Sequence, residues 1–309
     1  MKPRSQRSPA AAAGPFLVAF LSLLGSGCAG IPSRLEPAVA SRVESAKVQS
    51  WVAQDQLAIK VMASTYGSGL GLIGAIVDSG VTKGRASDAE RRVAPLRKEV
   101  PDVDVRARLW EKLVPAVKSV EWPRVVEVET VSAPAVVKPE HVRGSAFVSL
   151  ATSYDLSPNA SVFEMHSHYT LYVAGSTAPA AIGSVSYWSR LIGKGPDGKA
   201  KEDEEAIALW SAEGGASYRA AVDEGIAEII RMLGIALPYV GGKEAGGPAE
   251  AAEIKVDVTH GRGDFGLKTS RTTYRGTVLE RGPERLVFRA SPGWILSIPA
   301  ADIEERRLP

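Results

Sequence analysis

The sequence predicts an α+β protein: a mostly antiparallel sheet with helices on one face, followed by a small C-terminal all-β module of SH3-like size. Three observations carry this prediction. Apolar residues recur at steps of three and four between residues 86 and 117, the period changes to two from Arg124 onward, and four short strand-like runs follow a glycine-rich stretch at 241–253. The order of strand, helices, several strands and helices indicates the α+β class.

The N-terminal residues have the features of an export signal. Lys2, Arg4 and Arg7 precede an apolar core at 16–24, which is shorter than the roughly 20 residues that span a bilayer. The run "LGSGCA" at 24–29 resembles the lipobox of bacterial lipoproteins, in which small residues precede an acylated cysteine. The resemblance implies a signal peptide at 1–27, lipidation of Cys28 (with palmitate among the acyl chains), and attachment to the periplasmic face of the Gram-negative outer membrane. A plain secretory signal ending in small residues is the alternative.

Charge and cysteine content limit the classes of function. Without the leader, the 37 basic residues fall to 34 against 35 acidic ones, which leaves a net charge of −1 and no basis for nucleic-acid binding. Cys28 is the only cysteine, so no intramolecular disulfide is expected. The lipid anchor makes the membrane an expected partner. A protein partner or a second copy of the chain is also expected.

The first half of the chain divides into a lipidated tether at 28–48 and the start of an α+β domain expected to cover 49–240. A strand is predicted at 56–64, where apolar residues alternate. Amphipathic helices are predicted at 85–100 and at 101–117. The second has the stripe Val105, Leu109, Leu113 and Val117, and Asp102 or Asp104 as its N-cap.

The second half begins with strands at 124–132, 145–154 and 161–175, with "SPNA" at 157–160 as the turn of a hairpin. A shorter strand is expected at 184–191, and helical stretches at 201–210 and 217–234. Residues 241–253 have the composition of a flexible linker. The module at 254–309 is too small to be stable alone, so we expect it to dock on the larger domain.

The segment 66–80 contains G-x-G-x-x-G at Gly69, Gly71 and Gly74. A dinucleotide site needs a strand that runs directly into the first glycine and an acid at the end of a second strand, and neither context is present. No cofactor is therefore predicted.

The same segment places small residues at every fourth position, at Gly67, Gly71, Ala75 and Ser79. On a helix they form a flat ridge that another backbone can approach closely. Packing against the protein's own sheet is the first interpretation of this ridge. Self-association and contact with a lipid surface are the others.

Glu164, His166 and His168 alternate on one strand and therefore project from one face. E-x-H-x-H offers a carboxylate and two imidazoles to zinc or copper, whereas the ordinary interpretation is a solvated polar face. No nucleophile or phosphate-binding motif accompanies them. The order of segments and the 154–173 hairpin are loosely similar to envelope lipoproteins, some of which assemble secretion pores or activate peptidoglycan synthases. We expect a non-enzymatic binding or assembly module, with a periplasmic metal-binding protein and an unrecognised hydrolase as alternatives.

Overall fold

The computed structural model describes residues 33–60, 81–133, 145–193, 203–242, 250–263, 266–290 and 293–307. These all belong to one compact unit, Pro32–Pro309. The helices are α1 (Pro37–Ala40), α2 (Val81–Glu99), α3 (Val105–Lys118), α4 (Asp203–Val240) and the 3₁₀ turn η4 (Ala300–Asp302). The strands are β1 (Ser45–Val52), β2 (Ala58–Ile59), β3 (Arg124–Val131), β4 (Ala146–Leu156), β5 (Phe163–Val173), β6 (Ala181–Trp188), β7 (Glu250–Gly263), β8 (Gly266–Arg281), β9 (Arg285–Ala290), β10 (Trp294–Pro299) and β11 (Ile303–Arg307).

The α+β class is confirmed, and the sheet is mixed. Within the described residues, eleven strands form one sheet in the order β11-β7-β8-β9-β10-β6-β5-β4-β1-β3, with β2 beside β4. The strands from β4 to β6 and from β7 to β10 pair antiparallel with their sequence neighbours, whereas β1 pairs in parallel with β3 and β4, and β10 in parallel with β6. The expected antiparallel sheet therefore has parallel additions where strands distant in sequence meet.

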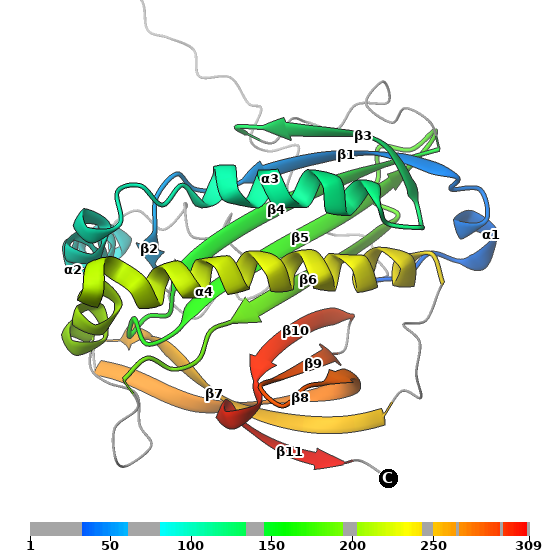
Figure 1. The fold of residues 1–309 in the computed structure, drawn as a ribbon. Coiled ribbons are helices and arrows are strands. Elements are labelled where there is room, and N and C mark those ends of the chain that lie inside the picture. Colours follow the sequence, from blue (N-terminus) through cyan, green and yellow to red (C-terminus); the bar gives the residue numbers. More distant parts are fainter. Residues whose placement is uncertain are drawn as a thin grey trace, which may run out of the picture. The chain divides into compact units, whose positions relative to one another are not determined.

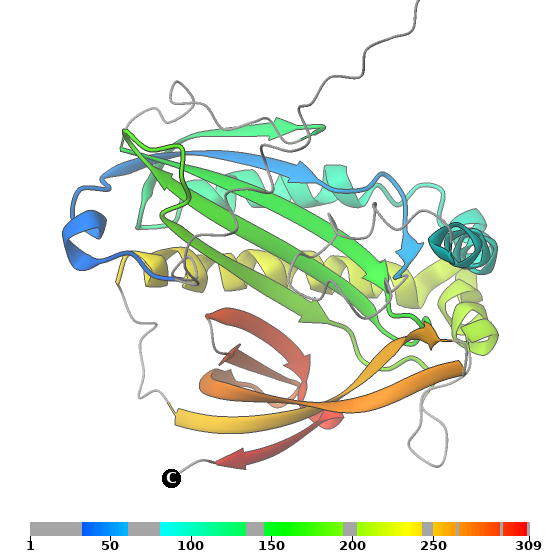
Figure 2. The same ribbon diagram turned by 180° about the vertical axis from the view of Figure 1, so that it is seen from behind.

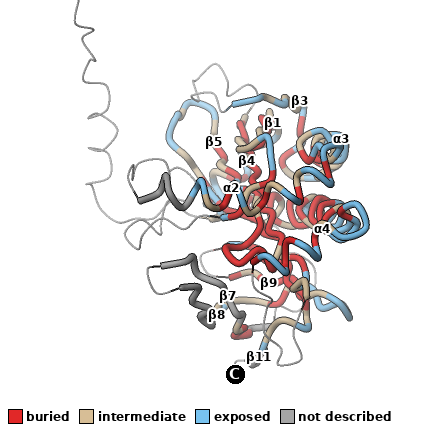
Figure 3. The backbone as a smooth tube through the Cα atoms, turned by 90° about the vertical axis from the view of Figure 1, so that its left-hand side faces the viewer, coloured by how far each residue is buried: buried red, intermediate tan, exposed pale blue. Residues whose placement is uncertain are grey.

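Helices α3 and α4 lie on one face of the sheet (Figure 1). The amphipathic stripe of α3 is confirmed, because Val105, Leu109, Leu113 and Val117 are all buried. The side chain of Asp104 caps this helix by accepting a hydrogen bond from the backbone N–H of Ala107 at 2.9 Å. Buried residues are concentrated between the helices and the sheet (Figure 3).

The C-terminal end of the expected tether is a β-strand. Residues 45–48, placed in the tether by their sequence, form the first half of β1, with Ala46 and Val48 buried. The strand pairs with β3 and β4, which lie far along the chain, so no local turn signal announces it. The strand expected at 56–64 is represented by the short β2, and residues 61–64 lie outside the described part.

The strands β7–β11 continue the sheet beyond β6 through the β6–β10 pair. Strand β7 begins at Glu250, so the last four residues of the expected linker are extended. A second, smaller group of buried apolar residues lies among these strands and is separate from the main core: Ala252, Ile254, Val278, Leu286, Phe288, Ala290, Leu296 and Ile298. Among the described residues, no helix combines the length and apolarity needed to cross a membrane.

Candidate functional site

The strands β4, β5 and β6 have two faces of different chemistry. The helix face, which α3 and α4 cover, includes the buried side chains of Tyr154, Phe163, Met165, Tyr169 and Tyr187. The alternate residues form what we call the polar face, which is on the side of the sheet that Figure 2 shows from behind the helices. It includes Asp155 of β4, Glu164, His166 and His168 of β5, and Ser186 of β6. The predicted alternation of β5 is confirmed.

A chain of hydrogen bonds crosses the polar face. Lys60, just after β2, donates from Nζ to Oε2 of Glu164 at 3.0 Å. The same carboxylate oxygen lies 3.1 Å from Nε2 of His166, whose Nδ1 lies 2.9 Å from Oγ of Ser186. Glu164 and Ser186 are buried, and each imidazole nitrogen has a partner. The pairing of β5 with β6 sets His166 directly opposite Ser186, which is why the hydroxyl reaches the ring.

Two carboxylates of this face sit directly opposite each other but ionise differently. Asp155 pairs with Glu164 across β4 and β5. Burial raises the pKa of Asp155 to about 6, although His166 and Lys60 oppose the shift. Burial also raises the pKa of Glu164, but Lys60 and His166 outweigh it and lower that pKa to about 2. Glu164 is therefore an anion at neutral pH, and Asp155 changes charge as the pH passes through about 6.

The three residues of the metal prediction, Glu164, His166 and His168, are not arranged as a metal-coordination site in this structure. Glu164 and His166 face each other, while His168 is exposed and takes no part in the chain of hydrogen bonds. The pKa of His168 is lowered, because neighbouring residues partly shield the ring from water and because His166 and Lys60 lie nearby. In the described ranges, no group of three or more histidine, cysteine, aspartate or glutamate side chains is placed to hold a metal ion. Sequence reasoning missed Lys60, Asp155 and Ser186, of which only Ser186 was recognisable, from the alternation of β6.

A separate cavity of about 470 Å³ opens on the helix side, where the end of β4 meets the α2–α3 connection. Its apolar wall consists of Leu57, Val100, Pro101 and Val103. Its polar wall consists of Asp55, Gln56, Arg97, Asp104, Arg106, Tyr154 and Tyr218. This volume lies within the ordinary range of small-molecule sites.

Both arginines of the cavity are already paired with an acid. Arg97 donates from Nε to the carbonyl of Leu57 at 2.7 Å, and its guanidinium group makes a two-pronged contact with Glu90 at 2.5 and 3.1 Å. Arg106 pairs with Asp55, and its guanidinium lies over the Trp110 ring at 5.8 Å. The guanidinium groups are thus held in place by their pairs.

The two tyrosines of the cavity are each only 2% exposed. Burial raises the pKa of Tyr154 to about 12 and also raises that of Tyr218, so both phenols are uncharged at neutral pH. Both tyrosines line the cavity, and neither hydroxyl is among the fully buried polar atoms of the described residues that lack a partner, so both hydroxyls remain open to the cavity. A phenol that opens to a cavity can donate and accept a hydrogen bond with a ligand there.

An interruption of α4 positions Tyr218. Ala212 has extended dihedral angles, and the next three residues are left-handed, with φ of 53° at Glu213, 64° at Gly214 and 77° at Gly215. A Cβ on Gly215 would lie 2.3 Å from a methyl group of Val100, so only glycine fits against this cavity residue. Backbone strain of this kind persists where surrounding structure holds it, and it concentrates near functional sites.

A salt bridge fixes the interruption to the α2–α3 connection. Arg219 contacts both carboxylate oxygens of Asp102 at 2.6 Å and donates to the carbonyl of Gly214 at 3.1 Å. The guanidinium of Arg219 lowers the pKa of Asp102 to about 2. The wall of the cavity therefore joins α4 to the segment between α2 and α3.

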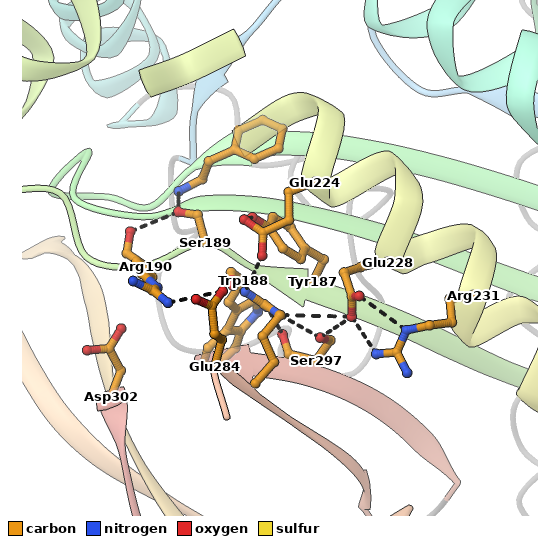
Figure 4. A network of polar contacts seen from close by, with 12 residues as sticks. Tyr187, Trp188, Ser189, Arg190, Glu224, Glu228, Arg231, Glu284, Ser297 and Asp302 are labelled. Atoms are coloured by element: carbon orange, nitrogen blue, oxygen red, sulfur yellow. Dashed lines mark hydrogen bonds and ion pairs between the residues drawn. The ribbon is translucent and has the colours of Figure 1, made fainter. Parts of the chain in front are cut away.

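A third polar network attaches α4 to the C-terminal strands (Figure 4). Arg285 of β9 donates to Glu224 at 3.0 Å, to Oγ of Ser297 at 2.9 Å and to the carbonyl of Trp188 at 2.6 Å, and its guanidinium stacks 4.5 Å from the Tyr187 ring. Oγ of Ser297 donates to Glu228 of α4 at 2.5 Å. These groups saturate one another, so we regard this network as structural.

Two predictions fall outside the described residues: the lipidation site at Cys28, and the ridge of Gly67, Gly71, Ala75 and Ser79. No protein-family model matches the chain, and no curated protein matches it either.

Proposed function

We propose that the protein is a lipid-anchored binding module of the cell envelope, with no catalytic role of its own. The observation that carries this proposal is the preformed cavity, whose walls are held by ion pairs and by the left-handed turn of α4. A site built before its ligand arrives binds without the cost of ordering its own groups.

The anchor is the part of the proposal that rests on sequence. We expect acylation at Cys28, in line with the lipobox-like run that precedes it. Cells fed an alkyne analogue of palmitate should label the wild-type chain, whereas Cys28→Ser should lose both the label and the membrane fraction. Ser26→Ala is the matched control and should keep both. A labelled Cys28→Ser chain would refute the anchor.

The binding role is tested in living cells without knowing the ligand. A photoreactive benzoylphenylalanine is introduced at Gln56, an exposed residue of the cavity, and at Glu111, an exposed residue of α3 outside it. Irradiation should add a discrete mass to the Gln56 variant and none to the Glu111 variant, as read by mass spectrometry of the intact protein. No adduct at Gln56, or the same adduct at both positions, would overturn the binding role.

We also propose that residues 254–309 act as a C-terminal β module that braces the large domain. The separate buried cluster around Phe288 supports this interpretation, as does the Arg285 network that joins the module to α4. Arg285→Met should loosen the contact. Amide hydrogen exchange in β9 and β10 should then be faster in the variant than in the wild type, whereas exchange in β5 should be unchanged. Equal exchange in the variant and the wild type would count against a bracing role.

A hydrolase is the second candidate, because Ser186, His166 and Glu164 are hydrogen-bonded in the order of a catalytic triad. A fluorophosphonate ester would label Ser186 if this serine were activated. Ser186→Ala should then abolish labelling, while Ser184→Ala on the same face should not. Absence of labelling in the wild type would dismiss this candidate.

A further inference from the structure

The cavity beside α2 and α3 presents hydrogen-bonding groups that its own residues leave unused. Tyr154 and Tyr218 line the same space, and although each residue is only 2% exposed, neither hydroxyl is among the fully buried polar atoms of the described residues that lack a partner. Both hydroxyls are therefore open to the cavity. A ligand that displaces water from these hydroxyls without a new hydrogen bond binds less favourably. The two hydroxyls are therefore the first feature that a ligand has to satisfy.

The charges of the cavity point to an uncharged ligand. The Arg106 guanidinium faces Asp55, and the Arg97 guanidinium faces Glu90, so each cation is already compensated. An anionic ligand would have to displace one of these acids, whereas a cationic ligand would have to compete with Arg106 at Asp55 or with the helix cap at Asp104. A neutral ligand can bind without breaking either pair.

The fixed ion pairs nevertheless offer several donors and acceptors at known positions. Carboxylate oxygens accept and guanidinium N–H groups donate, and Gln56 and the two phenols do both. The apolar wall of Leu57, Val100 and Val103 faces the same space. Several hydroxyl groups on a compact carbon ring with C–H faces match this combination.

We propose that this cavity binds an uncharged polyhydroxylated ligand, a sugar of one or two rings. The inference rests on the proposed binding function and assigns its ligand class. The sugar hydroxyls hydrogen-bond with Tyr154 and Tyr218, and the ring C–H groups pack on the apolar wall. The chemistry is the same for a free sugar and for the end of a glycan chain.

The test is calorimetric titration of the full chain, in a detergent without a sugar head group, with N-acetylglucosamine and with its β-1,4-linked disaccharide. If the single sugar binds, a free sugar is sufficient as the ligand. If only the disaccharide binds, the ligand is the end of a glycan chain. Tyr154→Phe and Tyr218→Phe should each weaken binding by up to about tenfold, the value of one neutral hydrogen bond. Tyr172→Phe, the same change at the far end of β5, should bind as the wild type does.

Thermal melting shows whether each variant is folded, and Val103→Phe, which fills the cavity from its apolar wall, gives an independent test. Loss of binding in a folded Val103→Phe chain is the expected result. No heat with either sugar at millimolar concentration, or equal binding by the Tyr154, Tyr218 and Tyr172 variants, would overturn the proposal. A persisting photo-adduct at Gln56 would then mean that the cavity binds another class of ligand, whereas its absence would end the binding function as well.

Discussion

The helix face and the polar face of β4–β6 are made by the same strands, yet they are stabilised in different ways. On the helix face, Phe163 packs edge-on against Tyr218 at 5.6 Å and lies 6.4 Å from Tyr187. On the polar face, one residue along the strand, the Glu164 carboxylate is held by Lys60 and His166. The first face depends on packed volume and the second on charge, so substitutions and pH should affect them differently.

The largest effect is expected on the helix face. Phe163 is fully buried between β5 and α4, so Phe163→Ala removes its packing and leaves a cavity. We expect a loss of about 3–5 kcal/mol in the free energy of unfolding, independent of pH, measured by urea denaturation. A loss below about 1 kcal/mol would mean that the helix face does not carry the core.

The next effect separates a buried carboxylate from an exposed one on the polar face. Glu164→Gln removes the charge that Lys60 and His166 contact, and we expect a cost of about 2–3 kcal/mol at pH 7. Glu127 on β3 is the control, because its side chain, which pairs with Lys47 at 3.1 Å, is about half exposed. Glu127→Gln should cost below about 1 kcal/mol. Equal costs would show that burial of Glu164 adds nothing.

How far the two faces follow from sequence depends on the range of the interactions. The alternation of β5 and the stripe of α3 are local patterns, and both are found as expected. The partners of Glu164 are not local, because Lys60 lies 104 residues away and reaches the carboxylate only through the parallel pairing of β2 with β4. No periodicity encodes that contact.

The cavity shows the same limit. Tyr154 and Tyr218 each fit an apolar pattern in their own element, and their chemistry becomes visible only when β4 and α4 bring them to one space. Two helical stretches were expected at 201–210 and 217–234, and the left-handed turn at 213–215 of α4 separates them. The sequence does not show in which direction the second stretch continues. Long-range pairing therefore determines both candidate sites.

The pH dependence of the polar face gives a third and smaller test. The pKa of Asp155 is raised to about 6 by burial, above the value of about 3.9 in an unfolded chain. The folded state then holds this proton more tightly, so the stability from Asp155 is present below about pH 4 and is lost as the pH rises through about 6. Glu164 has the opposite sign, because its pKa of about 2 means that stability is lost as the pH falls below about 4.

Asp155→Asn removes the first of these two slopes. We expect the variant to be more stable than the wild type by about 1–2 kcal/mol at pH 7 and equally stable near pH 4. Urea denaturation at several pH values between 4 and 7 measures the difference. A variant that is less stable at pH 7 would show that the Asp155 anion is favoured on this face.

The smallest effect concerns the hydroxyl oxygen of Tyr169 on the helix face. The Tyr169 ring lies across Gly183 of β6, and its hydroxyl is buried without a hydrogen-bond partner in the described part of the chain. Removal of an unsatisfied buried hydroxyl costs nothing, so Tyr169→Phe should be neutral or stabilising by up to about 1 kcal/mol. Tyr187→Phe is the matched contrast, because the Tyr187 hydroxyl donates to Glu224 at 2.9 Å, and its loss should cost about 1 kcal/mol. If the two variants lose the same stability, the Tyr169 hydroxyl has a hydrogen-bond partner in solution. The helix face would then depend on a polar interaction as well as on packing at this end of β5.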